Sequence, residues 1–262
     1  MIKFFRKTRY NIMLQNNTTK YLKYAIGEII LVVIGILIAL SINNWNQNRI
    51  ERKKEKQIIN ELIVDLEDQS KVLTNYIEVE SSFYQNGRDL LKYFSVNQTF
   101  YGADSIYGKL NSLVSRQTFN PINTTFQELI STGTIGILQD ETTKRKIIQY
   151  YNELKRISLV IGNNNIHIVD AIYQQELLKQ TTFILDEDDS DLKTINNAIF
   201  NEKSLGRIRQ ISKNELSIDR NTLHLFNLLE QRTVVAMSHM ELYKTVQKNT
   251  EQLLSDIKTP MD

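Results

Sequence analysis

Apolar residues form one unbroken block near the start of the chain. From Tyr24 to Trp45 the sequence reads YAIGEIILVVIGILIALSINNW, and Glu28 is its only charged residue. At about 1.5 Å per residue this block makes a helix of about 33 Å, enough to cross a hydrocarbon core of about 30 Å. Tyr21, Tyr24 and Trp45 flank the block at the positions of an aromatic belt. The pattern predicts one transmembrane helix over residues 24–45.

Two other interpretations of this block stay open. One is a buried helix of a soluble protein, although Ile29 to Leu40 are all apolar or glycine, more than a soluble core requires. The other is a cleaved signal peptide, which would have a basic start, an apolar core and small residues near Ala39 and Ser41. Such a leader would be unusually long, and the chain continues into a hydrophilic Asn-rich stretch.

Beyond the block, apolar residues recur at intervals of three and four, which predicts a long amphipathic helix over about residues 49–95. Three positions of the same series hold Gln69, Glu80 and Gly87 instead. We expect this interrupted heptad to pack in a helical bundle rather than in a continuous two-stranded coiled coil. The apolar members are Ile59, Leu62, Leu66, Leu73, Tyr76, Phe83, Leu90 and Phe94.

Capping residues place the start and end of the next helices. Thr125 and Glu128 have the spacing of a capping box, which predicts a short helix from Phe126 to Thr132 closed by Gly133. Asp140 is a suitable N-cap for a helix over about residues 140–180.

A last helix is expected over about residues 205–257, beginning near 205 or 213. Together the patterns predict an all-α fold, with one N-terminal transmembrane helix and then an antiparallel helical bundle with long helices. The bundle would form a soluble domain over residues 46–262.

Composition supports the helical interpretation. The chain of 262 residues has 9 Gly and 2 Pro, both well below usual frequencies, and these residues interrupt helices. It has no Cys, which excludes disulfides, thiolate nucleophiles and Cys-ligated metals.

Positive charge is concentrated at the N-terminus. Residues 1–45 contain six of the 32 basic and one of the 30 acidic residues, which leaves 26 and 29 for the remainder. The slightly acidic domain argues against nucleic-acid binding. Residues 1–23 form a basic tail, and the six basic residues before the span compare with five just after it. The positive-inside rule therefore predicts a cytoplasmic tail and an extracytoplasmic C-terminal domain at the cell (inner) membrane.

No pattern of catalytic, cofactor or metal-ligating residues is found, so we expect no enzyme activity. His167 could share a helix face with Asp170, but a metal site needs three or four ligands. The other two histidines are His224 and His239. The acidic segment 186–191 lacks the Gly and Glu of a calcium-binding loop, so a solvated turn is expected.

Three residues of the span are candidates for a role in the membrane. Gly35 and Ala39 form a small-xxx-small pair that can let two such helices approach closely, although the pattern is common in apolar segments. Glu28 is an ionisable group close to the bilayer and so a candidate functional carboxylate. The simpler alternative is an interfacial carboxylate paired with Lys20 or Lys23.

Two stretches resemble an uncharacterised family of small single-pass membrane proteins frequent in Bacteroidota. One is MIKFFRKTRYNIM followed by YAIGEIILVVIGILIALSINNWNQNR, and the other is TFQELISTGTIGILQDETTKRKIIQYYNELKRI, from Thr125 to Ile157. This chain differs at Thr134-Ile135-Gly136, where the family suggests polar residues. The resemblance implies a membrane location and an all-helical domain, and it supplies no activity and no functional residues.

Three functions are compatible with these features. The first is a membrane-anchored interaction or scaffold protein, whose partners would be the lipid bilayer and another envelope protein or a second copy. The second is a sensory or signalling input that works through a partner. The third is an enzyme whose site is assembled from scattered residues. No small-molecule ligand can be identified from the sequence.

Overall fold

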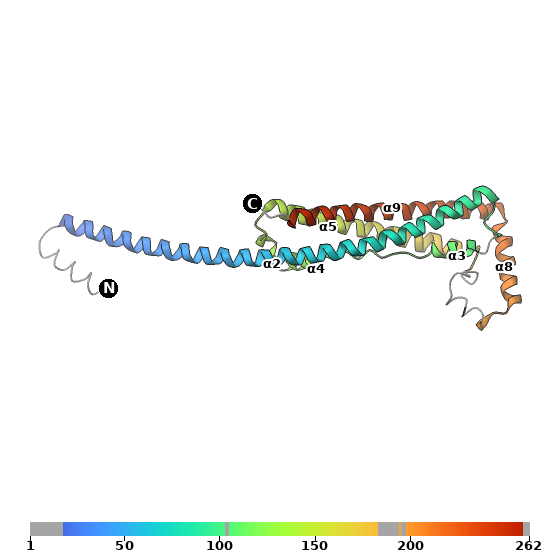
Figure 1. The fold of residues 1–262 in the computed structure, drawn as a ribbon, viewed down its shortest axis with the longest axis horizontal. Helices are drawn as coiled ribbons and strands as arrows, with labels where there is room; N and C mark the ends of the chain where they lie inside the picture. Colours follow the sequence, from blue (N-terminus) through green and yellow to red (C-terminus); the bar gives the residue numbers. More distant parts are fainter. Residues whose placement is uncertain (1–17, 103–104, 183–193, 195–197, 259–262) are drawn as a thin grey trace. The chain divides into compact units, whose positions relative to one another are not determined.

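The chain is helical throughout its described part. The computed structural model describes residues 18–102, 105–182, 194 and 198–258 (Figure 1). These residues form helices joined by turns and loops, with no β-strand among them, so the expected all-α fold is confirmed. The chain divides into two compact units, residues 1–58 and residues 59–262, and each is described by itself.

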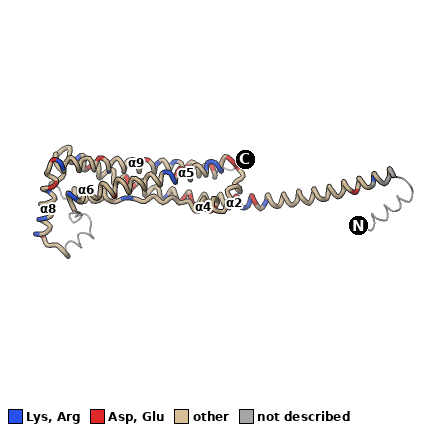
Figure 2. The backbone as a smooth tube through the Cα atoms, turned by 180° about the vertical axis from the view of Figure 1, so that it is seen from behind, with Lys and Arg blue, Asp and Glu red and all other residues tan. Residues whose placement is uncertain are grey.

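Unit 1 contains the first part of α2, a helix that spans Thr18–Asn97. Its large apolar side chains from Ile29 to Ile42 are all exposed. The most apolar 18 residues have a mean hydropathy of 2.8, and none of them is buried. Figure 2 shows this stretch as a long uncharged part of the tube. By length and composition, the helix is able to cross a membrane.

Unit 2 contains three long helical segments that lie side by side (Figure 1). They are the part of α2 from residue 59, α5 (Glu141–Asn164) with its π-helical continuation η2 (Asn165–Gln174), and α9 (Asp219–Lys258). Figure 2 shows charges of both signs along α5 and α9. Shorter elements complete the unit: α3 (Ser105–Ser112), α4 (Thr124–Ser131), η1 (Thr134–Ile137), α6 (Gln175–Leu177) and α8 (Glu202–Leu216).

Ion pairs and hydrogen bonds fix the directions of the long helices. Lys258 and Gln247 of α9 contact Glu67 and Thr74 of α2, so residue numbers fall in one helix as they rise in the other. The Tyr150–Thr250 hydrogen bond belongs to a similar series between α5 and α9. Helix α9 therefore runs antiparallel to both α2 and α5, and their apolar stripes close the core between them.

Two helix ends have the predicted residues in the predicted roles. The Asp140 carboxylate accepts hydrogen bonds from the backbone N–H groups of Thr142 and Thr143, so it is the N-cap of α5. Gly133 has φ 68°, and its N–H donates to the carbonyl of Ile130 after the end of α4. A left-handed residue at this position is most easily supplied by glycine.

The predicted capping box at Thr125 and Glu128 is wrong. Helix α4 begins at Thr124 and its N-cap is Asn123, whose side chain makes no capping hydrogen bond. The N–H of Thr125 instead donates to the Asp65 carboxylate of α2 at 2.8 Å. One free N–H group at the start of α4 thus finds its acceptor on another helix, which local spacing does not encode.

The segment expected as one helix over residues 205–257 is divided between α8 and α9. Asn221 and Thr222 donate side-chain hydrogen bonds to the carbonyls of Glu215 and Leu216, which satisfies the last turn of α8. Ile218, at the break, is exposed. The acidic segment 186–191 and the first 17 residues of the basic tail lie outside the described residues.

Candidate functional site

Two of the three interruptions in the α2 series have a packing role. Gln69 is buried, and its Oε1 accepts a hydrogen bond from the N–H of Ile122 at 2.7 Å. Gly87 lies against α9, where a Cβ atom would be only 2.0 Å from Thr233 Oγ1. The first interruption anchors the loop before α4, and the second allows close approach of two helices.

The third interruption, Glu80, lies in a buried polar contact with His239 of α9. Its Oε1 lies 3.5 Å from His239 Nδ1, and each side chain is only 1% exposed. The Asn164 amide of α5 lies 3.2 Å from His239 Nε2. When the amide donates to Nε2, a proton on the ring lies on Nδ1, which faces the carboxylate. His239 thereby joins three helices.

Arg232 completes this buried ionic layer, which we define as Glu80, Arg232 and His239. Its Nε and Nη2 donate to the carbonyls of Leu113 and Ser115 at 2.8 and 3.1 Å, and its guanidinium lies over the Phe83 ring. Burial lowers the pKa of Arg232 from its usual value, and the charge of Glu80 opposes that shift.

The ionic layer is closed to solvent. All three of its residues are buried, and neither Glu80 oxygen has a hydrogen-bond donor among the described residues. Removing one member of such a group leaves an uncompensated buried charge. The ionic layer therefore favours one register of α2, α9 and the loop after α3. The sequence signal for this layer is the presence of polar residues at inward positions of α2 and α9. The opposite charges of Glu80 and Arg232 indicate that these two helices are neighbours.

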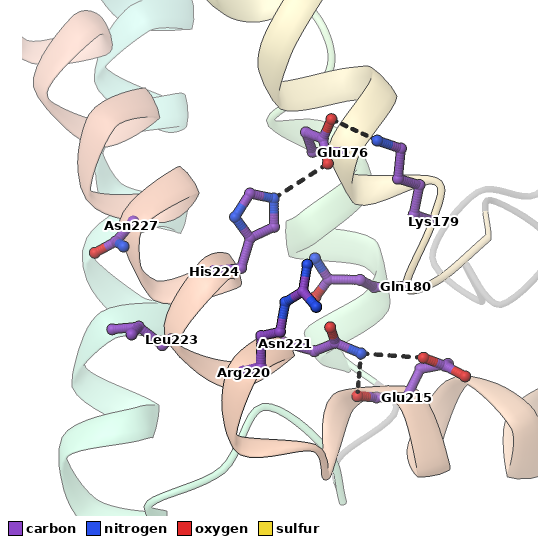
Figure 3. Close-up of a pocket in the computed structure, with 9 residues that line it drawn as sticks. All are labelled: Glu176, Lys179, Gln180, Glu215, Arg220, Asn221, Leu223, His224 and Asn227. Atoms are coloured by element: carbon purple, nitrogen blue, oxygen red, sulfur yellow. Dashed lines mark hydrogen bonds and ion pairs between the residues drawn. The ribbon is translucent and has the colours of Figure 1, made fainter.

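A polar surface pocket lies where α6, α8 and α9 meet (Figure 3). It has a volume of about 570 Å³. Glu176 contacts both Lys179 at 2.6 Å and His224 at 3.2 Å, and its hydrogen bond with Lys179 is the main cause of its lowered pKa. Gln180 is buried, and its Oε1 has no hydrogen bond among the described residues. The remaining lining residues are Glu215, Arg220, Asn221, Leu223 and Asn227.

A second surface hollow, the α4–α5 groove, has a volume of about 520 Å³. Phe126 of α4 and Tyr151 of α5 stack within it, with ring centroids 4.3 Å apart and planes inclined by 10°. Burial raises the pKa of Tyr151 above its usual value, and Tyr150 and Asp65 contribute to the same shift. The other lining residues are Pro121, Asn123, Gln127, Ile130, Ile148, Asn152, Lys155, Ser158 and Leu159.

The residues singled out from the sequence occupy different environments. Gly35 and Ala39 lie on the exposed part of α2, and nothing lies within 4 Å of a Cβ added at Gly35. Glu28 is half-buried on the same helix. The possible pairing of His167 with Asp170 is not formed, because Asp170 accepts a hydrogen bond from Arg116 at 2.7 Å while His167 is exposed.

Metal-ligating groups do not converge in the described part of the chain, where no set of three or more His, Cys, Asp or Glu side chains could hold an ion. His224 and His239 lie in the polar pocket and the ionic layer respectively, each with one carboxylate partner. Sequence reasoning missed Arg232 and Asn164, whose roles depend on contacts between helices.

Residues 28–204 match a family described as "Family of unknown function (DUF6090)". The chain belongs to this family. The DUF6090 match covers more than half of the chain and includes the apolar span from residue 28 onward, Glu80 and the α4–α5 groove, and it ends within α8. Arg232 and His239 lie beyond it. No curated protein and no solved structure matches the chain.

Proposed function

We propose that the protein is a membrane-anchored interaction protein, held by residues 24–45, whose helical bundle binds another envelope protein. The observation that carries the proposal is the uncovered apolar stretch from Ile29 to Ile42. Each large apolar side chain left in water forgoes about 1.5–3 kcal/mol of burial free energy, and a bilayer provides the missing apolar surroundings.

The proposal extends to topology, with the basic tail in the cytoplasm and the bundle outside. It is supported by the six basic residues before the span, compared with five after it. The chain contains no Cys, so Lys203→Cys in exposed α8 gives a single labelling site. Intact cells should label with an impermeant maleimide. Labelling only after lysis would show the opposite orientation.

Co-purification tests the interaction. The full chain, tagged at its C-terminus, is extracted from its native membrane in mild detergent, and the associated proteins are identified by mass spectrometry. An unrelated single-span protein with the same tag is the control. We expect a reproducible partner in stoichiometric amount that the control lacks. Recovery of the protein alone would contradict the proposal.

A sensory role is the second candidate, because the polar pocket of Figure 3 is open to solvent and contains the buried, unbonded Oε1 of Gln180. Arg220, on the same pocket, is exposed and forms no ion pair with a described residue. A small polar solute that raised the melting temperature of the full chain, but not that of an Arg220→Ala variant, would support this role. A panel of polar metabolites that left the melting temperature unchanged would count against it.

A further inference from the structure

The α4–α5 groove combines an aromatic floor with an apolar rim that faces solvent. Leu159 is 59% exposed and Ile130 is 49% exposed, on opposite helices of the groove. Between them lie the stacked rings of Phe126 and Tyr151. This arrangement offers a large apolar side chain more contact area than a flat helix surface does, and aromatic walls are typical of anchor-residue pockets.

Polar side chains along the groove have hydrogen-bonding groups to spare. Asn123, Gln127 and Asn152 line it, and none of their side chains is hydrogen-bonded to a described residue. Each primary amide has both a donor and an acceptor, as does each peptide unit of an extended chain. A row of such amides is therefore able to bind the backbone of a peptide whatever its side chains are.

The charge of the α4–α5 groove indicates which residues a partner should carry. Lys155 is the one charged residue among those that line the groove, and it is exposed. It forms no ion pair with another described residue, unlike neighbouring Arg156, which pairs with Glu153 at 2.7 Å. A carboxylate on the partner is the complement of this ammonium group.

We propose that the α4–α5 groove binds an extended peptide segment of the partner protein, which carries one large apolar side chain and one acidic residue. From Ile148 to Leu159 the groove follows α5 for about 16 Å at 1.5 Å per residue. An extended chain advances about 3.3 Å per residue, so the groove holds about five residues. This inference rests on the proposed interaction function and names the site at which the interaction occurs.

Peptide selection tests the groove directly. The full chain in lipid nanodiscs is used to select from a random twelve-residue peptide library displayed on phage. We expect enriched sequences to share an Asp or Glu at a fixed distance from a large apolar residue. Lys155→Glu should lower the affinity for these peptides about tenfold and should enrich basic sequences when the selection is repeated. Leu159→Asp should lower the affinity by at least as much.

Matched controls separate binding from folding. Lys248→Glu makes the same charge reversal and Val234→Asp makes a similar apolar-to-acidic change, both at exposed positions of α9, and neither should alter the affinity. Melting temperatures within a few degrees of the unsubstituted chain show that the variants are folded. Enriched peptides without an acidic residue, peptides that bind only as helices, or binding unchanged by Leu159→Asp would each overturn the inference.

The outcome for the groove is distinguishable from that for the proposed function. If a partner co-purifies equally well with the Leu159→Asp chain, the interaction function stands and the groove is not its site. If a second copy of the chain is the only molecule that binds, and Leu159→Asp abolishes its binding, the extended peptide is the wrong occupant. If a different protein co-purifies with the Val234→Asp chain but not with the Leu159→Asp chain, the result supports both the interaction function and the groove as its site.

Discussion

Glu80, His239 and Arg232 illustrate how single polar residues in an apolar core determine one arrangement of helices. A Glu on an inward position of α2 is costly by itself, because a charge inside a protein loses its hydration. His239 Nδ1 and the positive charge of Arg232 offset that cost in one helix register only. Any shift of α9 along α2 would separate the charges and leave each of them buried alone.

Replacing Glu80 by Leu should destabilise the chain by about 3–5 kcal/mol, because Arg232 would be left as an uncompensated buried charge. The Glu80→Leu, Arg232→Met double variant should recover part of that loss. Glu78→Leu, at an exposed position of the same helix, should change the free energy of unfolding by less than about 0.5 kcal/mol. Urea unfolding of the full chain in mild detergent measures all three.

Tyr150 makes the stability of the fold depend on pH in the alkaline range. Burial raises its pKa to about 12, while its hydrogen bond with Thr250 opposes the shift. Below pH 10 the residue is neutral in both folded and unfolded states, and between pH 10 and 12 the unfolded state alone releases the proton. Its stabilising contribution is therefore present below pH 10 and falls as pH rises towards 12, by about 1.4 kcal/mol per pH unit.

Tyr150→Phe should thus make the alkaline loss of stability less steep, even though it removes a hydrogen bond and lowers stability at pH 8 by about 1 kcal/mol. Unfolding curves between pH 8 and 11.5 compare the two slopes. Tyr84→Phe, at a half-buried position of α2, removes the same hydroxyl away from the Tyr150–Thr250 contact and is the control for that change. Equal slopes for Tyr150→Phe and the unsubstituted chain would contradict the assignment.

At the scale of the elements, the packing distance between α2 and α9 depends on a residue without a side chain. Gly87 is buried against Thr233, whose Oγ1 donates to the carbonyl of Leu229 at 2.6 Å and so has a fixed position. Rotation of this β-branched side chain would place its methyl group in the same space. The close approach of α2 and α9 therefore depends on Gly87 and Thr233 together, not on either residue alone.

Gly87→Ala should lower the free energy of unfolding by about 1–3 kcal/mol, since the added methyl group cannot be placed without moving a helix. Gly206→Ala is the control, because nothing lies within 4 Å of its added Cβ and the residue lies within α8. That change should stabilise the chain by about 0.5–1 kcal/mol through helix propensity. Thermal unfolding measures both effects. If Gly87→Ala and Gly206→Ala changed the stability in the same direction, this result would refute the close-packing argument.

At the scale of the whole molecule, the chain joins an uncovered apolar segment to a closed bundle. The bundle buries the apolar stripes of its long helices against one another. The apolar segment of unit 1 has no cover among the described residues. The proposed anchoring to a bilayer would account for this contrast between the two units.

The anchor is tested by two charges placed in its middle. Val33→Asp with Ile34→Arg should release the chain from membranes, because each charge at the centre of a span costs about 2.5–3.5 kcal/mol of insertion free energy. Fractionation after an alkaline carbonate wash measures the effect, and Val33→Leu with Ile34→Leu is the control. If the charged variant stayed in the membrane pellet like the control, these residues would not lie within the bilayer.

The sequence by itself determined the features that depend on neighbours along the chain. The apolar block, the helical periods, the Asp140 cap and the Gly133 turn all follow from residue spacing, because helix geometry and backbone conformation are local. The sequence also marked Gln69, Glu80 and Gly87 as exceptions in an apolar series. It could not say what each exception contacts.

Only the tertiary structure decided the contacts between distant segments. Asp65 replaces the expected capping box of α4, and His239 of α9 lies beside Glu80 of α2. The break between α8 and α9 divides a continuous helical pattern. The α4–α5 groove likewise exists only where two helices pack side by side. These features depend on how helices are placed relative to one another in space, which the periodicity of any one helix does not contain.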